Sequence, residues 1–458
     1  MKKIDFIDQI LREKMLPEPQ GIFSVCSSNT QVLRTCMRRA KKIGSPLLIE
    51  STCNQVNQFG GYMNMTPAQF AEYIETIARE SGFACEQILL GGDHLGPSAW
   101  KQEPAESAMK KSEDLISACI RAGYRKIHLD ASMPCGDDPN PLPPEIVAER
   151  EARLCRAGVE TLEMLGGTVT DLAFVVGTEV PTPGGSCAEE ESLHISTVKE
   201  TEDNIAAIRD AFRKNRLEAA WERVRAFVVQ PGVEFSDSHI HIYDPEKARE
   251  LSTFIERYEN LIYEAHSTDY QTGASLRRMV EDHFAILKVG PELTHALREA
   301  LFSLEEIEKE IYHGSTMRLS GLKAVLDEAM TSNPQFWKQY YSKDSRVQFI
   351  QRRYSLLDRS RYYLNSLKVR EAARILESNL SKADIPLSLI SQFFPDQNLK
   401  IKEGIIEKTF QGLIEARIAD VFDRYNQACR SHTPICQPAK KFLKNGKWTR
   451  RNRGQPNI

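Results

Sequence analysis

The chain has 458 residues, of which 41% are hydrophobic and 27% charged, and its formal net charge at pH 7 is -3. This composition is typical of a globular protein with a large core, and the small net charge gives no reason to expect a nucleic-acid partner. No stretch is apolar enough to span a membrane, and the opening MKKIDFIDQILREKM lacks the apolar run of a secretory signal. The ten cysteines show no CxxC spacing, so we expect reduced thiols and a cytoplasmic protein.

Short, nearly continuous apolar runs recur through the first two thirds of the chain, as expected for parallel strands that are covered on both faces. The eight runs are residues 21–26, 46–50, 87–94, 126–130, 172–179, 225–230, 260–266 and 284–289. Helix-length segments separate them, such as 66–81, which starts with Thr66 and Pro67, and 106–122. Eight strand–helix units over about 270 residues predict an α/β protein with a (β/α)8 TIM barrel, and a doubly wound open sheet is the less favoured alternative.

The pattern changes after the eighth predicted strand, where strand-like runs give way to helical stretches rich in aromatic and charged residues. We therefore expect three parts, which are a barrel over residues 1–295, an α-helical C-terminal region over 296–436 packed on the barrel, and a basic flexible tail over 437–458. Within the helical region, residues 352–363 are dense in Arg and Tyr. Arginine forks suit phosphate groups, but a solvent-exposed helix face is the favoured interpretation of this segment.

Charged and polar residues gather at one end of the predicted strands. The side chains at these ends include Glu50, Asp93, His94, His128, Asp130, Ser132, Glu179, Gln230, His266, Asp269 and Lys288. In (β/α)8 barrels the active site is built from the C-terminal ends of the strands. One such residue alone would be interpreted as a hydrogen-bonded structural group. Eight polar strand ends in register predict a binding or catalytic site.

Two histidines suggest a metal at this site. His94 and His266 would lie at the ends of the third and seventh strands, across the mouth of the barrel. Two neutral imidazoles with carboxylates such as Glu179 or Glu234 could hold a divalent metal, although both histidines could instead hydrogen-bond to nearby backbone. The HxH pair at 239–241 is a second choice, because it lies several residues beyond the sixth strand.

The neighbours of His94 indicate the chemistry of the site. Asp93 directly precedes His94, so it can reach the same cavity and exchange protons with a substrate hydroxyl. A metal that polarises a ketose carbonyl would stabilise the negative charge of an enediolate. The candidates for hydroxyl binding, proton transfer and charge compensation are Asp130, Glu179 and Lys288. Asn54, Gln55, Asn57 and Gln58 offer neutral hydrogen-bonding groups, which predict a polyhydroxylated substrate.

Six long strings at these strand ends are unusual enough to indicate a family. They are residues 50–62, 91–97, 128–133, 177–185, 230–235 and 266–272. On these strings the chain resembles the GatZ/KbaZ-like family, the Z subunits of tagatose-1,6-bisphosphate aldolase, over residues 21–430. Proteins of this family also carry the label tagatose 6-phosphate kinase. The kinase label has no support in the sequence, because neither a GxxxxGK[ST] string nor a glycine-rich cradle follows a predicted strand.

The family is similar in turn to class II ketose-bisphosphate aldolases, which are zinc-dependent (β/α)8 barrels. The resemblance implies that Asp93 is a proton donor, that His94 and His266 bind zinc, and that Glu179 corresponds to the catalytic glutamate after the fifth strand. The aldolases take a third zinc histidine from the end of the sixth strand.

This chain departs from the aldolases at two positions. It has no histidine at the end of the sixth strand, so we expect Gln230 or Glu234 to act as the substitute ligand. The glycine-rich phosphate loop after the seventh strand corresponds here to residues 267–270, where Asp269 stands in place of phosphate-binding amides. We therefore do not expect a bisphosphate to bind in the usual aldolase mode, and we count Asp269 among the candidate catalytic residues.

The resemblance implies two functions. The first is metal-dependent C4 epimerisation of a ketose or ketose phosphate of the tagatose/fructose type, by retro-aldol cleavage and re-addition. The second is that of a non-catalytic Z subunit, which stabilises and activates the catalytic subunit of a class II D-tagatose-1,6-bisphosphate aldolase. The full set of polar strand ends favours the enzyme, with zinc as cofactor and with homo-oligomerisation expected. The candidate substrate-binding residues are Glu50, Asn54, Gln55, His128, Ser132 and Lys288.

Overall fold

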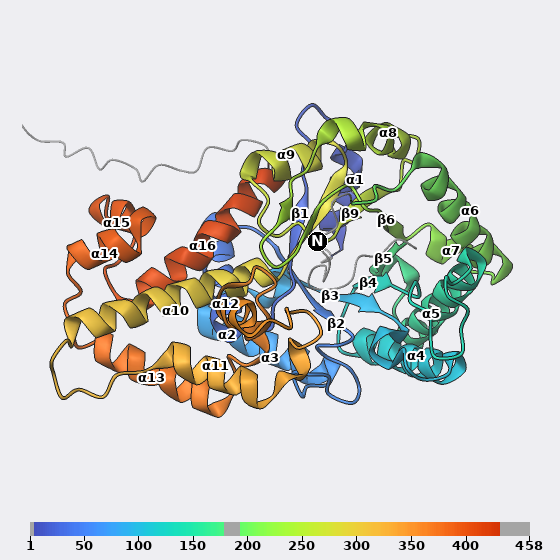
Figure 1. Ribbon diagram of the computed structural model, residues 1–458. Helices are drawn as coiled ribbons and strands as arrows, with labels where there is room; N and C mark the ends of the chain where they lie inside the picture. The colour runs from blue at the N-terminus through green and yellow to red at the C-terminus, as the bar shows by residue number, and fades with distance from the viewer. Residues whose placement is uncertain (1–3, 178–192, 431–458) are drawn as a thin grey trace, which may run out of the picture.

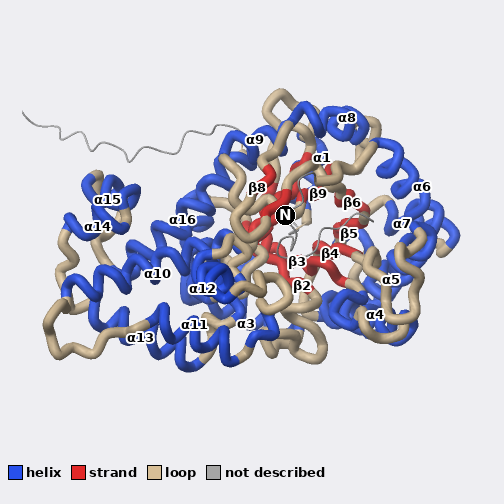
Figure 2. The backbone as a smooth tube through the Cα atoms, in the orientation of Figure 1, coloured by secondary structure: helices blue, strands red, loops and turns tan. Residues whose placement is uncertain are grey.

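The structure, a computed structural model, describes residues 4–177 and 193–430, so Glu179 and the predicted tail over 437–458 lie outside the described residues. Its centre is a closed barrel of eight parallel strands (Figures 1 and 2). In chain order the barrel strands are β1 (Ile22–Val25), β2 (Leu47–Thr52), β3 (Ile88–Leu95), β4 (Lys126–Leu129), β5 (Ala173–Val176), β6 (Val224–Val228), β9 (Ile262–Ala265) and β10 (Phe284–Val289). Each predicted apolar run overlaps one of these strands, to within two residues at the ends of β2, β3 and β6, which confirms the predicted (β/α)8 barrel.

The barrel closes because β1 pairs with β2 on one side and with β10 on the other. Helices surround it, and they are α2 (Thr30–Ile43), α3 (Pro67–Ser81), α4 (Ala105–Arg121), α5 (Pro144–Met164), α6 (Val198–Lys214), α7 (Glu218–Trp221), α8 (Pro245–Ile255), α9 (Gly273–Glu281) and α10 (Pro291–Ile311). The predicted start of α3 is confirmed, since Thr66 and Gln69 form a capping box. The 3-10 turns η1 (Cys85–Gln87), η2 (Pro97–Trp100) and η3 (Val169–Asp171) and the hairpin strands β7 (Glu234–Phe235) and β8 (Ile240–His241) lie in the connections.

The helix α1 (Asp5–Glu13) covers the N-terminal end of the barrel. Its apolar residues Ile7 and Ile10 belong to a small buried cluster that also contains Leu48, Leu89 and Ile286 from the barrel strands. The cluster packs the N-terminal end of the barrel with apolar side chains. The open end is therefore the C-terminal one, where the polar residues of the strands gather.

The remaining helices extend to one side of the barrel, on the left of Figure 1. They are α11 (Leu322–Ser332), α12 (Ser345–Tyr354), α13 (Leu367–Leu380), α14 (Leu387–Phe393), α15 (Pro395–Lys402) and α16 (Phe410–Cys429), with the 3-10 turns η4 (Pro334–Phe336) and η5 (Arg359–Tyr362) between them. Phe422 of α16 packs edge-on against Phe23 of β1, with ring centroids 5.0 Å apart. Because α10 runs unbroken through residue 295, the expected division of the chain at that residue stays a prediction. No helix in the described ranges is long and apolar enough to cross a membrane.

Candidate active site

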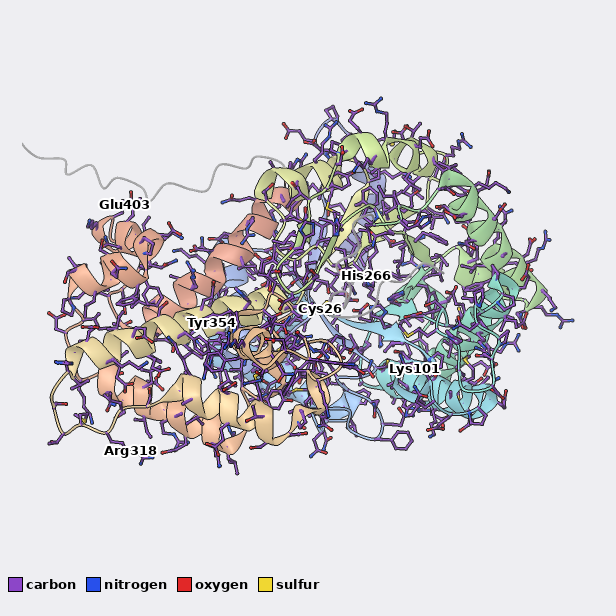
Figure 3. The ribbon with its side chains drawn as sticks, viewed as in Figure 1. Cys26, Lys101, His266, Arg318, Tyr354 and Glu403 are labelled. Carbon is purple, nitrogen blue, oxygen red and sulfur yellow. The ribbon has the colours of Figure 1, made fainter. Side chains whose placement is uncertain are left out.

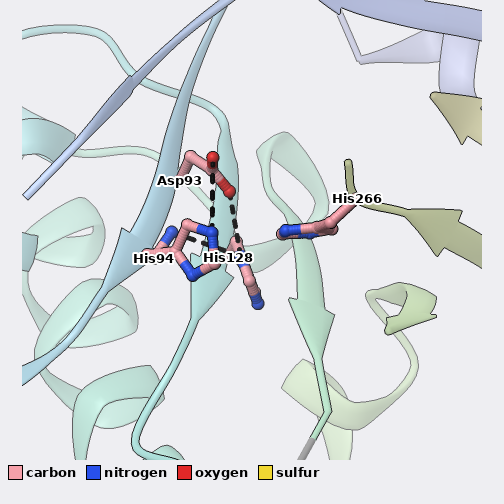
Figure 4. A group of neighbouring side chains, drawn as sticks. All are labelled: Asp93, His94, His128 and His266. Atoms are coloured by element: carbon pink, nitrogen blue, oxygen red, sulfur yellow. Dashed lines mark hydrogen bonds and ion pairs between the residues drawn. The ribbon is translucent and has the colours of Figure 1, made fainter. Parts of the chain in front are cut away.

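Three histidines converge at the C-terminal mouth of the barrel (Figure 4). His94 belongs to β3, His128 belongs to β4, and His266 directly follows β9. Their ring centroids form a nearly equilateral triangle, with separations of 4.8 Å for His94 and His266, 5.1 Å for His94 and His128, and 5.2 Å for His128 and His266. All three are buried, and with Asp93 they offer possible ligand atoms within 4.8 Å of one another.

Each imidazole has one nitrogen occupied by an acidic residue. His94 Nδ1 lies 2.8 Å from Asp130 Oδ2, His266 Nε2 lies 3.0 Å from Glu264 Oε1, and His128 Nδ1 lies 3.1 Å from Asp93 Oδ1. A histidine that binds a metal usually donates its second ring N–H to a carboxylate, as the contacts of His94 and His266 allow. His128 Nδ1 also accepts the backbone N–H of His94, at 3.2 Å. The other nitrogen of each ring is then left to face the cluster, and His128 Nε2 is fully buried without a hydrogen-bond partner in the described structure.

A backbone irregularity turns two consecutive side chains into the barrel. In a regular strand Asp93 and His94 would point to opposite faces. The register between β3 and β4 shifts between Gly92 and Leu95, and His94 has a left-handed backbone with φ 48°. Both side chains line the same cavity as a result. A positive φ is uncommon for a residue other than glycine and is often found at functional sites.

Beneath the histidines lies a buried network of lysines and carboxylates. Lys126 Nζ lies 2.6 Å from both Glu50 Oε1 and Glu264 Oε2. Lys288 Nζ lies 2.7 Å from Asp93 Oδ1 and also contacts Glu50 and Glu264. Glu50, predicted to bind substrate, is thus held by two lysines and by the hydroxyl of Ser24, which donates to it at 2.5 Å.

The buried charged groups of the site have a net negative charge, which favours a bound cation. Its buried carboxylates are Glu50, Asp93, Asp130 and Glu264, and its buried ammonium groups are those of Lys126 and Lys288. With neutral histidines these six groups carry two excess negative charges, which is costly in a buried site unless a positive charge compensates them. A divalent cation among the three imidazoles would balance the site.

The ionisation of the cluster fits the same arrangement. Burial lowers the pKa of His266 to about 3, so its ring is neutral near pH 7, which is the form that binds metals. Burial also disfavours a charged His94, but Asp93 and Asp130 outweigh burial and raise the pKa of His94. Burial likewise opposes the charge of Asp93, yet His94 and Lys288 hold the pKa of Asp93 well below its usual range. The space between the histidines and Asp93 therefore favours a positive charge.

A cavity of about 410 Å³ lies over this cluster. The predicted site residues that line it are Asn54, Gln55, Asp93, His94, His266, Asp269 and Lys288. Figure 3 labels three of its lining residues, Cys26, Lys101 and His266. The opposite wall comes from the helical region and consists of Gln335, Phe336, Gln339, Tyr340, Arg359, Arg361 and Tyr362. The cavity is thus enclosed by both parts of the chain.

The predicted residues His128, Asp130 and Ser132 are not part of the cavity lining, whereas Asp269 lines the cavity and is held by α10. His128 and Asp130 support the cluster, and the Ser132 hydroxyl donates to Asp130 Oδ1 at 2.6 Å. Asp269 Oδ1 accepts from the backbone amides of Gly290 and Glu292 at the start of α10, at 3.0 and 2.8 Å. Burial, with the nearby Glu292, raises the pKa of Asp269 to about 7.

The two residues expected to replace a third histidine are engaged elsewhere. Gln230 Oε1 accepts from the backbone amides of Gly232 and Val233, at 2.9 and 3.0 Å, so this side chain folds back on its own loop. Glu234 Oε1 accepts from the amide of Phe235. Among the described residues, the cluster of possible ligands contains His128 and does not contain Glu234. The geometry therefore places His128 of β4, rather than Gln230 or Glu234, among the candidate ligands.

The sequence around His128 carries a local pattern that places this residue in the site. Lys126, His128 and Asp130 alternate with Ile127 and Leu129, so the three polar side chains share one face of β4.

The prediction of a solvent-exposed helix face over 352–363 was wrong. Helix α12 ends at Tyr354, and Arg359 in η5 is only 4% exposed.

The closed parallel barrel, with its polar cavity at the C-terminal ends of the strands, defines a TIM-barrel protein with the architecture typical of enzymes. The chain belongs to the D-tagatose-1,6-bisphosphate aldolase subunit GatZ/KbaZ-like family, whose profile matches residues 7–430. This agrees with the resemblance seen in the sequence.

Among solved structures, the chain is similar to a protein from Sinorhizobium meliloti 1021 described as a probable tagatose 6 phosphate kinase. The two are 38% identical, the match covers 90% of this chain and 100% of the other, and the TM-score is 0.82. A fructose-bisphosphate aldolase from Campylobacter jejuni matches over 86% of this chain and 93% of its own, with 12% identity and a TM-score of 0.42. A TM-score this low adds nothing to the assignment.

Proposed function

We propose that this protein is a metal-dependent enzyme that inverts C4 of a tagatose- or fructose-type ketose, or of its phosphate. The proposal rests on one observation, that three buried histidines and Asp93 form a cluster whose members Asp93, His94 and His266 line a cavity. The family description, which refers to tagatose-1,6-bisphosphate, supports the choice of a ketose as substrate. A kinase is not proposed, because the sequence has no phosphate-binding glycine motif.

The residues present fit a divalent metal. His94, His128 and His266 would hold it, and three imidazoles with an open position are a typical catalytic zinc set. The unpartnered Nε2 of His128 and the excess negative charge of the site favour this assignment. When bound, the metal would supply positive charge to the carbonyl and hydroxyl oxygens of the ketose.

The side chains of the cavity can move the protons that epimerisation requires. Asp93 is ionised and held by Lys288, so it can accept the proton of the C4 hydroxyl. The C3–C4 bond then breaks, its electron pair remains with C3, and a three-carbon enediolate and an aldehyde result. Rotation of the aldehyde exposes its other face, and re-addition of C3 forms the C4 epimer as an alkoxide.

A second acid must return a proton to this alkoxide. Asp269 lines the cavity, and its pKa of about 7 keeps a share of it protonated near neutral pH. After the transfer Asp93 is protonated and Asp269 is ionised, and exchange with water restores both. Glu179, which the resemblance implies as a catalytic glutamate, lies outside the described residues.

The test is turnover of defined sugars by the purified, metal-loaded protein. D-Tagatose 6-phosphate and free D-tagatose are incubated separately, and the appearance of D-fructose 6-phosphate or D-fructose is followed by NMR. We expect Asp93→Asn to lower the rate by about 10²- to 10⁴-fold, because it removes the proton acceptor. His313→Ala, which removes an exposed histidine far along the chain, should leave the rate unchanged. No epimer from either sugar, with zinc, manganese or cobalt, would reject the proposal.

A second function is favoured by the word subunit in the family description. In this case the protein would stabilise and activate the catalytic subunit of a class II tagatose-bisphosphate aldolase. Mixing the two proteins and measuring aldol cleavage distinguishes the functions. Activation of the aldolase by a protein that turns over no sugar alone would favour the subunit role.

A further inference from the structure

Two arginines from the helical region face the same cavity as the histidine cluster. Arg359 and Arg361 both belong to the turn η5, and both line the cavity together with His94, His266 and Lys288. They lie more than 60 residues beyond the last barrel strand, so only the packing of the helical region brings them to the barrel mouth. One wall of the cavity therefore carries the histidine cluster, and another wall carries the two arginines.

The turn that carries the arginines is fixed in place by Asp358. This residue has a left-handed backbone with φ 42° and is 1% exposed. Its Oδ1 accepts from Arg298 Nε and from the Ser360 hydroxyl, each at 2.8 Å, and its Oδ2 accepts from the Thr294 hydroxyl at 2.6 Å. The charge of Asp358 is therefore matched by Arg298 of α10. The turn is thus anchored, and Asp358 does not neutralise the charges of Arg359 and Arg361.

The guanidinium of Arg359 is held by its surroundings while its outer nitrogens remain unused. Its Cζ lies 3.5 Å from the ring centroid of Tyr340 and 5.0 Å from that of Tyr362. Its Nε donates to the carbonyl of Phe336 at 2.6 Å. No hydrogen bond recorded between described residues uses its two Nη groups. Stacking on tyrosine leaves the edge of a guanidinium available for a forked contact to an anion.

Arg361 is oriented by neighbours of its own turn. One Nη donates to the carbonyls of Leu357 and Asp358, and the other Nη donates to Tyr362 Oη at 3.0 Å. The Cζ lies 4.5 Å from the ring centroid of Tyr362. These partners are neutral, so they orient the group without neutralising its charge. Nearby Asp269 feels the charge of Arg361, which acts to lower the pKa of that carboxyl.

In the described part of the chain, neither arginine forms an ion pair with a carboxylate. Other arginines of the same segment do, since Arg352 and Arg353 both pair with Asp327. Partly or fully buried positive charges are costly when they lack a counterion. A ligand with an anionic group would supply that counterion.

We infer that Arg359 and Arg361 form a subsite for the terminal anionic group of the substrate, a phosphate ester or a carboxylate at the end of the ketose opposite the reacting carbons. The inference rests on the proposed function for the ketose end, which the histidine cluster and Asp93 would bind. It specifies the class of substrate as an acidic ketose rather than a neutral one. Lys101 also lines the cavity, and its charge adds to those of the two arginines.

Binding measured by calorimetry on the full-length protein tests this subsite without requiring turnover. The probes are D-fructose, D-fructose 6-phosphate and D-fructuronate. For the wild type we expect at least one of the two acidic sugars to bind at least about tenfold more tightly than D-fructose. The acidic sugar with the higher affinity identifies the anionic group. Arg359→Gln and Arg361→Gln should each weaken that sugar about 10- to 100-fold and leave D-fructose within about twofold.

Arg374→Gln is the matched control, because Arg374 is exposed on α13 and pairs with Glu371. Thermal unfolding shows which variants are folded, and if Arg359→Gln is not, the wild-type preference and Arg361→Gln decide the question. Equal wild-type affinity for all three sugars, or unchanged affinity for the acidic sugar in folded arginine variants, would overturn the inference. Arginine-dependent binding without epimerisation would instead keep the subsite and reject the proposed function. Epimerisation of neutral D-fructose with no preference for acidic sugars would keep the proposed function and overturn the subsite.

Discussion

His94 on β3 and Asp130 directly after β4 are joined by a 2.8 Å contact between Nδ1 and Oδ2. Both residues are buried, and Asp130 Oδ1 also accepts from the Ser132 hydroxyl and amide, so this carboxylate is fixed before it meets the imidazole. The contact sets the orientation of the ring and leaves Nε2 directed to the other histidines. Asp130 is thus a positioning residue, and its role can be separated from direct metal binding.

We expect Asp130→Asn to weaken metal binding about 10- to 100-fold, because the amide can accept the Nδ1 proton but lacks the charge that makes the ring more basic. Zinc affinity is measured by competition with a chromophoric chelator. Asp203→Asn is the control, since Asp203 is exposed on α6 and pairs with Lys199. Wild-type zinc affinity in Asp130→Asn would show that Asp130 does not position a metal ligand.

His128 provides the sharpest test of the metal ligands themselves. We predict about one divalent metal per chain in the wild type, and loss of most of it in His128→Ala, as in His94→Ala and His266→Ala, because each removes one of three ligands. Elemental analysis of the purified proteins measures this, with His313→Ala as the control. Gln230→Ala should keep its metal, since its side chain is hydrogen-bonded to its own loop. The reverse result, metal kept without His128 and lost without Gln230, would restore the ligand set expected from the sequence.

The sequence predicted the barrel well because both of its signals are local. Apolar runs of strand length and polar residues at their ends depend only on neighbouring residues, and they located all eight strands. The ligand set was harder to predict, since histidines from separate strands leave no common spacing in the sequence. The resemblance to aldolases implied Gln230 or Glu234 instead of His128. The burial of Arg359 could not be read from residues 352–363 at all. It depends on Asp358 meeting Arg298 of α10, a contact between positions 60 residues apart.

The buried network beneath the cavity should contribute strongly to stability. Lys126 lies between Glu50 and Glu264, and all three side chains are fully buried. Lys126→Met removes one of the two ammonium groups that Glu50 and Glu264 share and leaves only Lys288 between these buried carboxylates, so we expect a loss of about 3–5 kcal/mol in the free energy of unfolding. Urea denaturation measures it. Lys199→Met, at an exposed ion pair, should change the value by less than about 0.5 kcal/mol. A similarly small change in Lys126→Met would mean that the network does not hold these charges in solution.

Asp269 predicts a specific dependence of stability on pH. Burial, with the charge of Glu292, raises its pKa from 3.8 to about 7 in the folded protein. Between these two values the folded state keeps a proton that the unfolded state has released, so the stability contribution of Asp269 falls as pH rises from about 4 to about 7. Asp269→Asn can still accept from the amides of Gly290 and Glu292 but does not titrate. We therefore expect the variant to gain stability relative to the wild type across this window, by up to about 4 kcal/mol.

Urea denaturation of both proteins at pH 4, 5.5, 7 and 8 measures the difference. Asp344→Asn is the matched control, because Asp344 caps the start of α12 in the same way but is exposed to solvent. Its difference from the wild type should change far less over the same range. A constant difference between Asp269→Asn and the wild type from pH 4 to 8 would mean that Asp269 titrates alike in the folded and unfolded states. It would then be unable to hold the proton that the proposed epimerisation assigns to it near neutral pH.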